Sequence, residues 1–99
     1  MRLEVANLVE KGPLPPSISD LPTIREWQHA LEKITAPVSD EEAIALVALF
    51  PKVEDECFGL AWTLVHLIET APHWPLPDCL HDKKNPWIVR LRNAAGLLS

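Results

Sequence analysis

The stretch that decides the fold is CFGLAWTLVHLIETA, residues 57–71, in which only four of the fifteen side chains are clearly polar. On a helix, Thr63, His66 and Thr70 fall together with Gly59 within an arc of about 60°, and apolar side chains occupy most of the remaining circumference. A helix that is apolar that far around needs neighbours on several sides. Fifteen residues are too few to cross a bilayer, so those neighbours must be protein. We therefore predict a buried central helix over residues 55–71.

Three further helical patterns flank this stretch and predict helices over residues 21–35, 39–50 and 86–98. The first has apolar residues at spacings of three and four. The second begins with Ser39 three residues before Glu42, the spacing of a capping box, and its short connection to residue 55 predicts that it lies antiparallel to the central helix. The third begins with Asn85 and Pro86, a capping residue followed by the residue favoured at the first helical position.

These patterns predict an all-α fold and a single domain covering residues 1–99. We expect a compact bundle of about four helices, or two stacked helical hairpins, with the central helix in the middle. Residues 1–20 are predicted to be less regular. Within them, residues 2–11 could form a short helix or an edge strand, with the helix favoured, and the sequence GPLPP at residues 12–16 predicts a spacer along the surface.

The charge is distributed unevenly. The net charge is −5, yet residues 38–82 hold nine acids and one base, whereas residues 83–99 hold four bases and no acid. A net negative protein lacks the basic face that nonspecific nucleic-acid binding requires, so we predict no nucleic-acid partner. An uneven field can steer a charged protein partner. Two cysteines are too few for a disulfide framework, and no targeting segment follows Met1, which predicts a cytoplasmic protein with no membrane partner.

Catalytic motifs are missing from the sequence. It contains neither a GxSxG turn nor a phosphate-binding GxxxxGK loop. Cys57 and His66 would lie about 13 Å apart along one helix, too far to form a thiol–base pair. We therefore predict no catalytic residue, and we interpret Cys57 as a small core side chain and His66 as a packing histidine.

The connection over residues 72–85 gathers metal-ligand side chains, namely His73, Asp78, Cys79, His81 and Asp82. Their spacing matches none of the usual structural zinc patterns, so we predict neither a metal nor a cofactor, although a small metal- or thiol-dependent enzyme that uses residues 73–82 stays an alternative. Long loops in compact domains are more often functional than short ones.

Tryptophans and acids mark the candidate contact residues. Trp27 and Trp62 are predicted to be buried on helix faces, whereas Trp74 and Trp87 flank the proline-rich loop and are candidates for exposure. An exposed tryptophan beside mixed charge is typical of an interaction hot spot, although Trp74 could equally cover the core. We predict a partner-binding surface that includes the residues Asp40, Glu41, Glu42, Trp74, Asp78 and Asp82. The acids also have a simpler explanation, since carboxylates are favoured at helix N-termini.

Residues 54–75, EDECFGLAWTLVHLIETAPHWP, resemble the middle of short bacterial all-helical immunity proteins, some of which are built of HEAT-like helical hairpins. The resemblance implies a cytosolic protein without catalysis that neutralises a cognate toxin by occupying its active surface. The four basic residues after position 82 depart from the acidic character common among such inhibitors. A homodimer that buries Trp74 and Trp87 against a second copy is an alternative, and the sequence leaves open whether the protein is a monomer or a homodimer.

Overall fold

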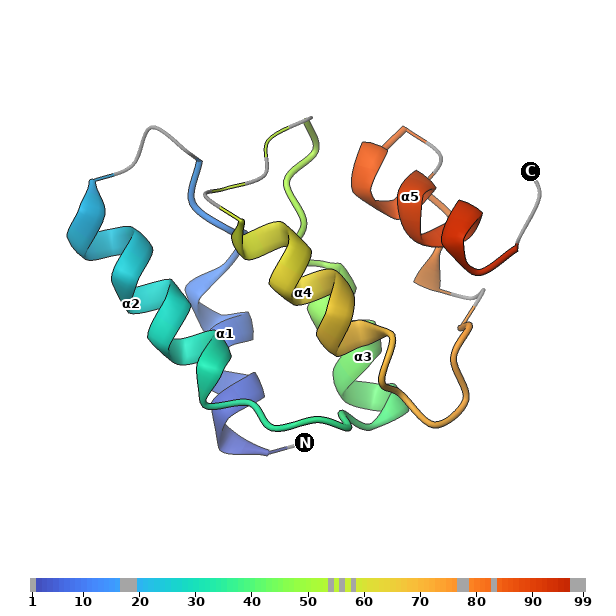
Figure 1. The fold of residues 1–99 in the computed structure, drawn as a ribbon, viewed down its shortest axis with the longest axis horizontal. Coiled ribbons are helices and arrows are strands. Elements are labelled where there is room, and N and C mark those ends of the chain that lie inside the picture. Colours follow the sequence, from blue (N-terminus) through green and yellow to red (C-terminus); the bar gives the residue numbers. More distant parts are fainter. Residues whose placement is uncertain are drawn as a thin grey trace.

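The computed structural model describes residues 2–16, 20–53, 55, 57, 59–76, 79–82 and 84–96. These residues form five helices and no strand, which confirms the all-α prediction (Figure 1). The helices are α1 (Leu3–Lys11), α2 (Leu21–Glu32), α3 (Asp40–Val47), α4 (Leu60–Ile68) and α5 (Pro86–Ala94). Residues 2–11 therefore contain a helix, the favoured of the two predictions. Within the described ranges, no helix is long and apolar enough to cross a membrane.

The central helix is shorter than predicted, because α4 begins at Leu60 rather than at residue 55. The backbone of Cys57 has φ +52° and that of Gly59 has φ +83°, and these left-handed conformations cannot belong to a right-handed α-helix. The Asp55 carboxylate accepts the N–H of Cys57 at 2.8 Å, a turn that competes with helix formation. The connection between α3 and α4 is therefore longer than predicted from the sequence.

The pairing of α3 with α4 agrees with the sequence prediction. These two helices pack against each other more extensively than any other pair in the described part of the chain. The N–H of Val38, just before α3, donates to Thr70 Oγ1, just after α4, at 3.0 Å. The start of α3 therefore lies at the end of α4, and the two helices run in roughly opposite directions (Figure 1).

Most of the core lies on one side of α4. Its buried residues form a single stripe: Leu60, Ala61, Leu64, Val65 and Ile68. On the other side Trp62, Thr63 and His66 are exposed. The polar stripe predicted on this helix is therefore a solvent face along Thr63 and His66. The predicted neighbours on several sides are present, because α2 and α3 pack against α4 and Trp62 contacts Trp87 of α5.

The burial of Trp62 and Trp87 is the reverse of the prediction. Trp87, at the start of α5, is fully buried, while Trp62 is 40% exposed. The Trp87 ring stacks on Phe50 with ring centroids 5.9 Å apart and meets the edge of Trp62 at 5.0 Å. Its Nε1–H donates to the carbonyl oxygen of Asp55 at 3.2 Å. Trp87 thus anchors α5 in the core, and Trp27 is buried as predicted.

Candidate functional site

The acidic run at the start of α3 is divided by the helix geometry. Ser39 caps α3 as predicted: its side chain accepts the N–H of Glu42, and the Glu42 carboxylate accepts the N–H of Ser39. Glu41 is exposed, Asp40 is half-buried, and Glu42 is only 3% exposed. The three acids predicted to contact a partner therefore lie in three different environments.

Glu42 is occupied within the protein. The Arg2 side chain donates to both of its carboxylate oxygens, from Nε at 2.9 Å and from Nη2 at 3.2 Å, and the backbone N–H of Arg2 adds a third bond at 3.1 Å. Burial alone would raise the pKa of Glu42, but hydrogen bonds from Ser39 and Arg2 and the Arg2 charge outweigh it and lower the pKa to about 2. Glu42 is thus a structural carboxylate that its own chain already occupies.

Arg2 joins the start of α1 to the segment that precedes α3. Besides Glu42, its guanidinium donates to the carbonyl oxygens of Thr35 at 2.8 Å and Pro37 at 3.0 Å. We call Arg2 and Glu42 with these two carbonyl groups the Arg2 clamp. The clamp was not predicted from the sequence, because the groups that Arg2 contacts lie 33 to 40 positions away along the chain.

Asp40 holds the loop that follows α4. Its Oδ1 accepts the backbone N–H of His73 at 3.1 Å, and its Oδ2 lies 2.5 Å from Nδ1 of the His73 ring. The carboxylate at the first position of α3 therefore fixes both the backbone and the side chain of a residue 33 positions away. The His73 side chain itself remains 81% exposed. Sequence reasoning grouped His73 with possible metal ligands and missed this contact.

Trp74 follows directly and is half-buried, packed against the core. Its N–H donates to the carbonyl oxygen of Ala71 at 3.1 Å, which continues the turn that ends α4. Trp74 therefore covers part of the core, one of the two alternatives predicted for it, and is also partly exposed. Asp40 contacts His73 at the point where the start of α3 meets the loop after α4 (Figure 1), and Glu41 and Trp74 are their neighbours along the chain; we call these four residues the acidic–aromatic surface.

Of the other predicted contact residues that the structure describes, Asp82 does not join this surface. Asp82 is exposed, and its Oδ1 accepts the N–H of Lys84 at 3.0 Å in the turn that leads into α5. In Figure 1 the start of α5 lies at the upper edge of the molecule, whereas the start of α3 and the loop after α4 lie at the lower edge. Asp78 lies outside the described residues.

The Asp40–His73 pair resembles the arrangement with which hydrolases orient a histidine, which then activates a neighbouring hydroxyl group as the nucleophile. Ser39 Oγ accepts the N–H of Glu42 in the helix cap. Thr70 Oγ1 donates to the carbonyl oxygen of Leu67 at 2.6 Å and accepts the N–H of Val38. Both hydroxyls are committed to the ends of helices, so the geometry gives no support to a nucleophile at this pair.

The cysteines also lie in structural positions. Cys57 is fully buried, and burial together with the charge of Asp55 raises the pKa of its thiol to about 11. The half-buried Cys79 donates its S–H to the carbonyl oxygen of Leu76 at 3.2 Å. Within the described ranges, His, Cys, Asp and Glu side chains form no group of three or more that could hold a metal ion.

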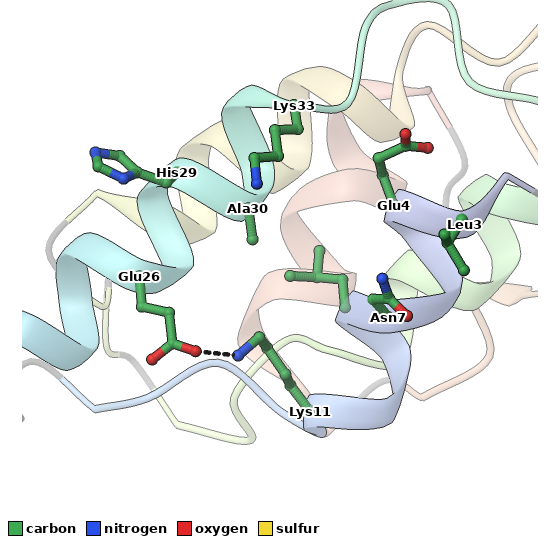
Figure 2. Close-up of a pocket in the computed structure, with 9 residues that line it drawn as sticks. Leu3, Glu4, Asn7, Lys11, Glu26, His29, Ala30 and Lys33 are labelled. Atoms are coloured by element: carbon green, nitrogen blue, oxygen red, sulfur yellow. Dashed lines mark hydrogen bonds and ion pairs between the residues drawn. The ribbon is translucent and has the colours of Figure 1, made fainter.

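A groove between α1 and α2 was not predicted. It has a volume of about 520 Å³ and is lined by Leu3, Glu4, Asn7, Leu8, Lys11, Glu26, His29, Ala30 and Lys33 (Figure 2). Lys11 and Glu26 form an ion pair across it at 2.5 Å. The one sequence signal for it is a repeat of opposite charges seven residues apart on each helix.

Comparisons with known proteins identify no relative: no protein-family model, curated protein or solved structure matches the chain.

Proposed function

We propose that this chain is a non-enzymatic protein-binding module that neutralises a cognate bacterial toxin or enzyme in the cytoplasm by covering its active surface. The observation that carries the proposal is the acidic–aromatic surface. Asp40 fixes the loop after α4 through two contacts with His73, the residue before the half-buried Trp74, and the exposed Glu41 follows Asp40 in α3. The choice of a toxin or enzyme as the partner rests on the resemblance of residues 54–75 to immunity proteins.

Tryptophan is among the side chains most often found at the centre of binding hot spots, because it buries a large area at little cost in conformational entropy. Trp74 is already packed against the core, so its side chain would lose little additional conformational entropy on binding. The acids around it would attract a basic partner and raise the association rate. The partner surface that fits is therefore cationic with an apolar pocket, as the active sites of enzymes that bind phosphates often are.

The homodimer that buries Trp74 and Trp87 is less well supported. The Trp87 side chain is fully buried in its own chain, against Phe50 and Trp62. It cannot contact a second copy without α5 leaving the core. Trp74 alone remains available for such an interface.

The test begins with capture of the tagged protein from a lysate of its own organism, followed by identification of any partner present in equal amount. The purified partner is then assayed for an enzymatic activity that the protein inhibits at a 1:1 ratio. Trp74→Ala should weaken this inhibition by at least about tenfold, and Glu41→Gln by several-fold through a slower association rate. Trp62→Ala is the matched control, since it removes another partly exposed tryptophan from a different surface. Equal inhibition by Trp74→Ala and wild type, with the helical circular-dichroism signal intact, would refute the proposed surface.

A further inference from the structure

The groove between α1 and α2 carries a regular pattern of charge. On α1, Glu4 stands seven residues before Lys11, and Glu26 of α2 stands seven residues before Lys33, which directly follows the end of that helix and keeps a helical backbone conformation. Residues seven apart on a helix lie on nearly the same face, and all four of these side chains line the groove. Each helix therefore presents an acid at one end of the groove and a base at the other (Figure 2).

The ion pair across the groove sets the two helices in register. Lys11 contacts Glu26, so the end of α1 is level with the first half of α2. Seven residues, about 10 Å, back along α1 and forward along α2 bring Glu4 level with Lys33. The two helices are thus antiparallel, and the midpoints of their charge pairs, at Asn7–Leu8 and His29–Ala30, lie at the same level in the groove.

This arrangement is complementary to itself. A second copy can be placed face to face on the groove, related to the first by a two-fold axis. This axis lies in the interface, perpendicular to both helices, and passes over their midpoints. The axis lays α1 antiparallel on the α1 of the other copy and α2 antiparallel on its α2. Each Glu4 then meets a Lys11 of the other copy, and each Glu26 meets a Lys33, so all four acid–base contacts are satisfied by a single axis.

We infer that this groove is an interface between two copies of this chain, which associate as a two-fold symmetric dimer through α1 and α2. Leu3 at the edge of the groove is 69% exposed, and in this register it would be covered in part by the end of α1 of the other copy, near its Gly12. The floor is formed by the side chains of Leu8 and Ala30, with the polar Asn7 near the axis. Two helices of 9 and 12 residues make a small interface, so the dissociation constant should lie in the range from about 10 µM to about 1 mM.

The inferred interface is distinct from the proposed partner-binding surface. In Figure 1, α1 and α2 lie on the left side of the molecule, and the loop after α4 lies at its lower right. The dimer would therefore leave both acidic–aromatic surfaces open, and would present two of them to partners. Loss of dimerisation and loss of partner binding are separate outcomes, because the variants that test them lie on different surfaces.

The first test measures the mass of the wild-type protein by sedimentation equilibrium at low ionic strength, up to a concentration of about 1 mM. The chain mass is 11.1 kDa, and we expect the average mass to rise toward twice that value and to fall again when salt is added. A mass of 11.1 kDa at every concentration would overturn the inference. A small molecule that co-purifies with the monomer and is lost on Glu4→Lys would likewise overturn it and make the groove a ligand site.

The second test exchanges charges. Glu4→Lys places two lysine–lysine contacts across the axis and should weaken dimerisation by about tenfold or more. Glu10→Lys is its matched control, because it makes the same charge change on α1 outside the groove lining. The control brings the net charge closer to zero and should leave association unchanged or slightly stronger. Equal dimerisation of Glu4→Lys and wild type would refute the interface.

The third test uses two complementary proteins. One carries Glu4→Lys and Glu26→Lys, so that the four rim charges are positive, and the other carries Lys11→Glu and Lys33→Glu, so that they are negative. Both variants lose the exposed Lys11–Glu26 pair, which contributes little to stability. Neither should self-associate, and an equimolar mixture should form a 1:1 heterodimer at least as tight as the wild-type homodimer. Failure to associate when mixed, with both circular-dichroism spectra helical, would overturn the inference.

Discussion

The acid sensitivity of this fold should be concentrated in Glu42. Its pKa is lowered from 4.5 to about 2 in the folded protein, and a difference of one pKa unit corresponds to about 1.4 kcal/mol. Ionised Glu42 therefore contributes about 3 kcal/mol to the free energy of unfolding at neutral pH, a large share of the stability of a small domain. Because the folded pKa lies below the unfolded one, this contribution is complete above about pH 5 and is lost as the pH falls toward 2.

The measurement is urea unfolding followed by circular dichroism at a series of pH values between 7 and 2. Wild type should lose about 3 kcal/mol more than Glu42→Gln over this range, because glutamine does not titrate. At pH 7 the Gln variant should be less stable by a similar amount, since Arg2 then lacks its carboxylate partner. Glu41→Gln is the control and should follow wild type, because Glu41 is exposed. If Glu42→Gln and wild type lose stability in parallel as the pH falls, the role assigned to the Arg2 clamp is wrong.

Three other substitutions or treatments test the core. In denaturant titrations, Trp87→Ala should lower the free energy of unfolding by about 3–5 kcal/mol, because alanine leaves a cavity beside Phe50. Trp87→Phe should lower it by less, because phenylalanine keeps most of the contacts. Equal losses for the two variants would contradict the packing of Trp87. In the folded protein at pH 8, Cys57 should resist a thiol reagent that modifies it rapidly in urea, because the thiol is buried and has a pKa of about 11. Mass spectrometry of the labelled protein measures the modification, and rapid labelling of Cys57 in the folded protein would contradict its burial. Gly59→Ala should cost about 1 kcal/mol in thermal or urea unfolding, since φ +83° is unfavourable for alanine; an unchanged midpoint would show that the turn before α4 can relax.

The sequence predicted those parts of the fold that depend on neighbouring residues. The cap at Ser39 needs only the residue three positions later, and the start of α5 needs only Asn85, whose side chain accepts the N–H of Trp87 at 2.9 Å. The start of α4 was placed five residues too early. A run of apolar residues conceals the break, which is made by the Asp55 turn and the left-handed Gly59.

The candidate site was only partly predictable, for a physical reason. The acids of α3 and Trp74 could be named as candidates from their types, but which of them share a surface is decided by contacts between distant positions. Asp40 reaches His73, and Glu42 reaches Arg2, each through side chains that have no helical spacing to reveal them. Likewise, which of Trp62 and Trp87 is buried depends on how α5 docks on α4, which the sequence pattern does not show.

The Arg2 clamp also constrains how this protein can change over generations. A mutation at Arg2 alone leaves a carboxylate buried without its cation, and a mutation at Glu42 alone leaves a guanidinium without its anion, so each single step is costly. Replacement of both by apolar side chains of similar size can be nearly neutral. Substitutions at the two positions should therefore be coupled, so that lineages that retain this fold keep both charged residues or replace both.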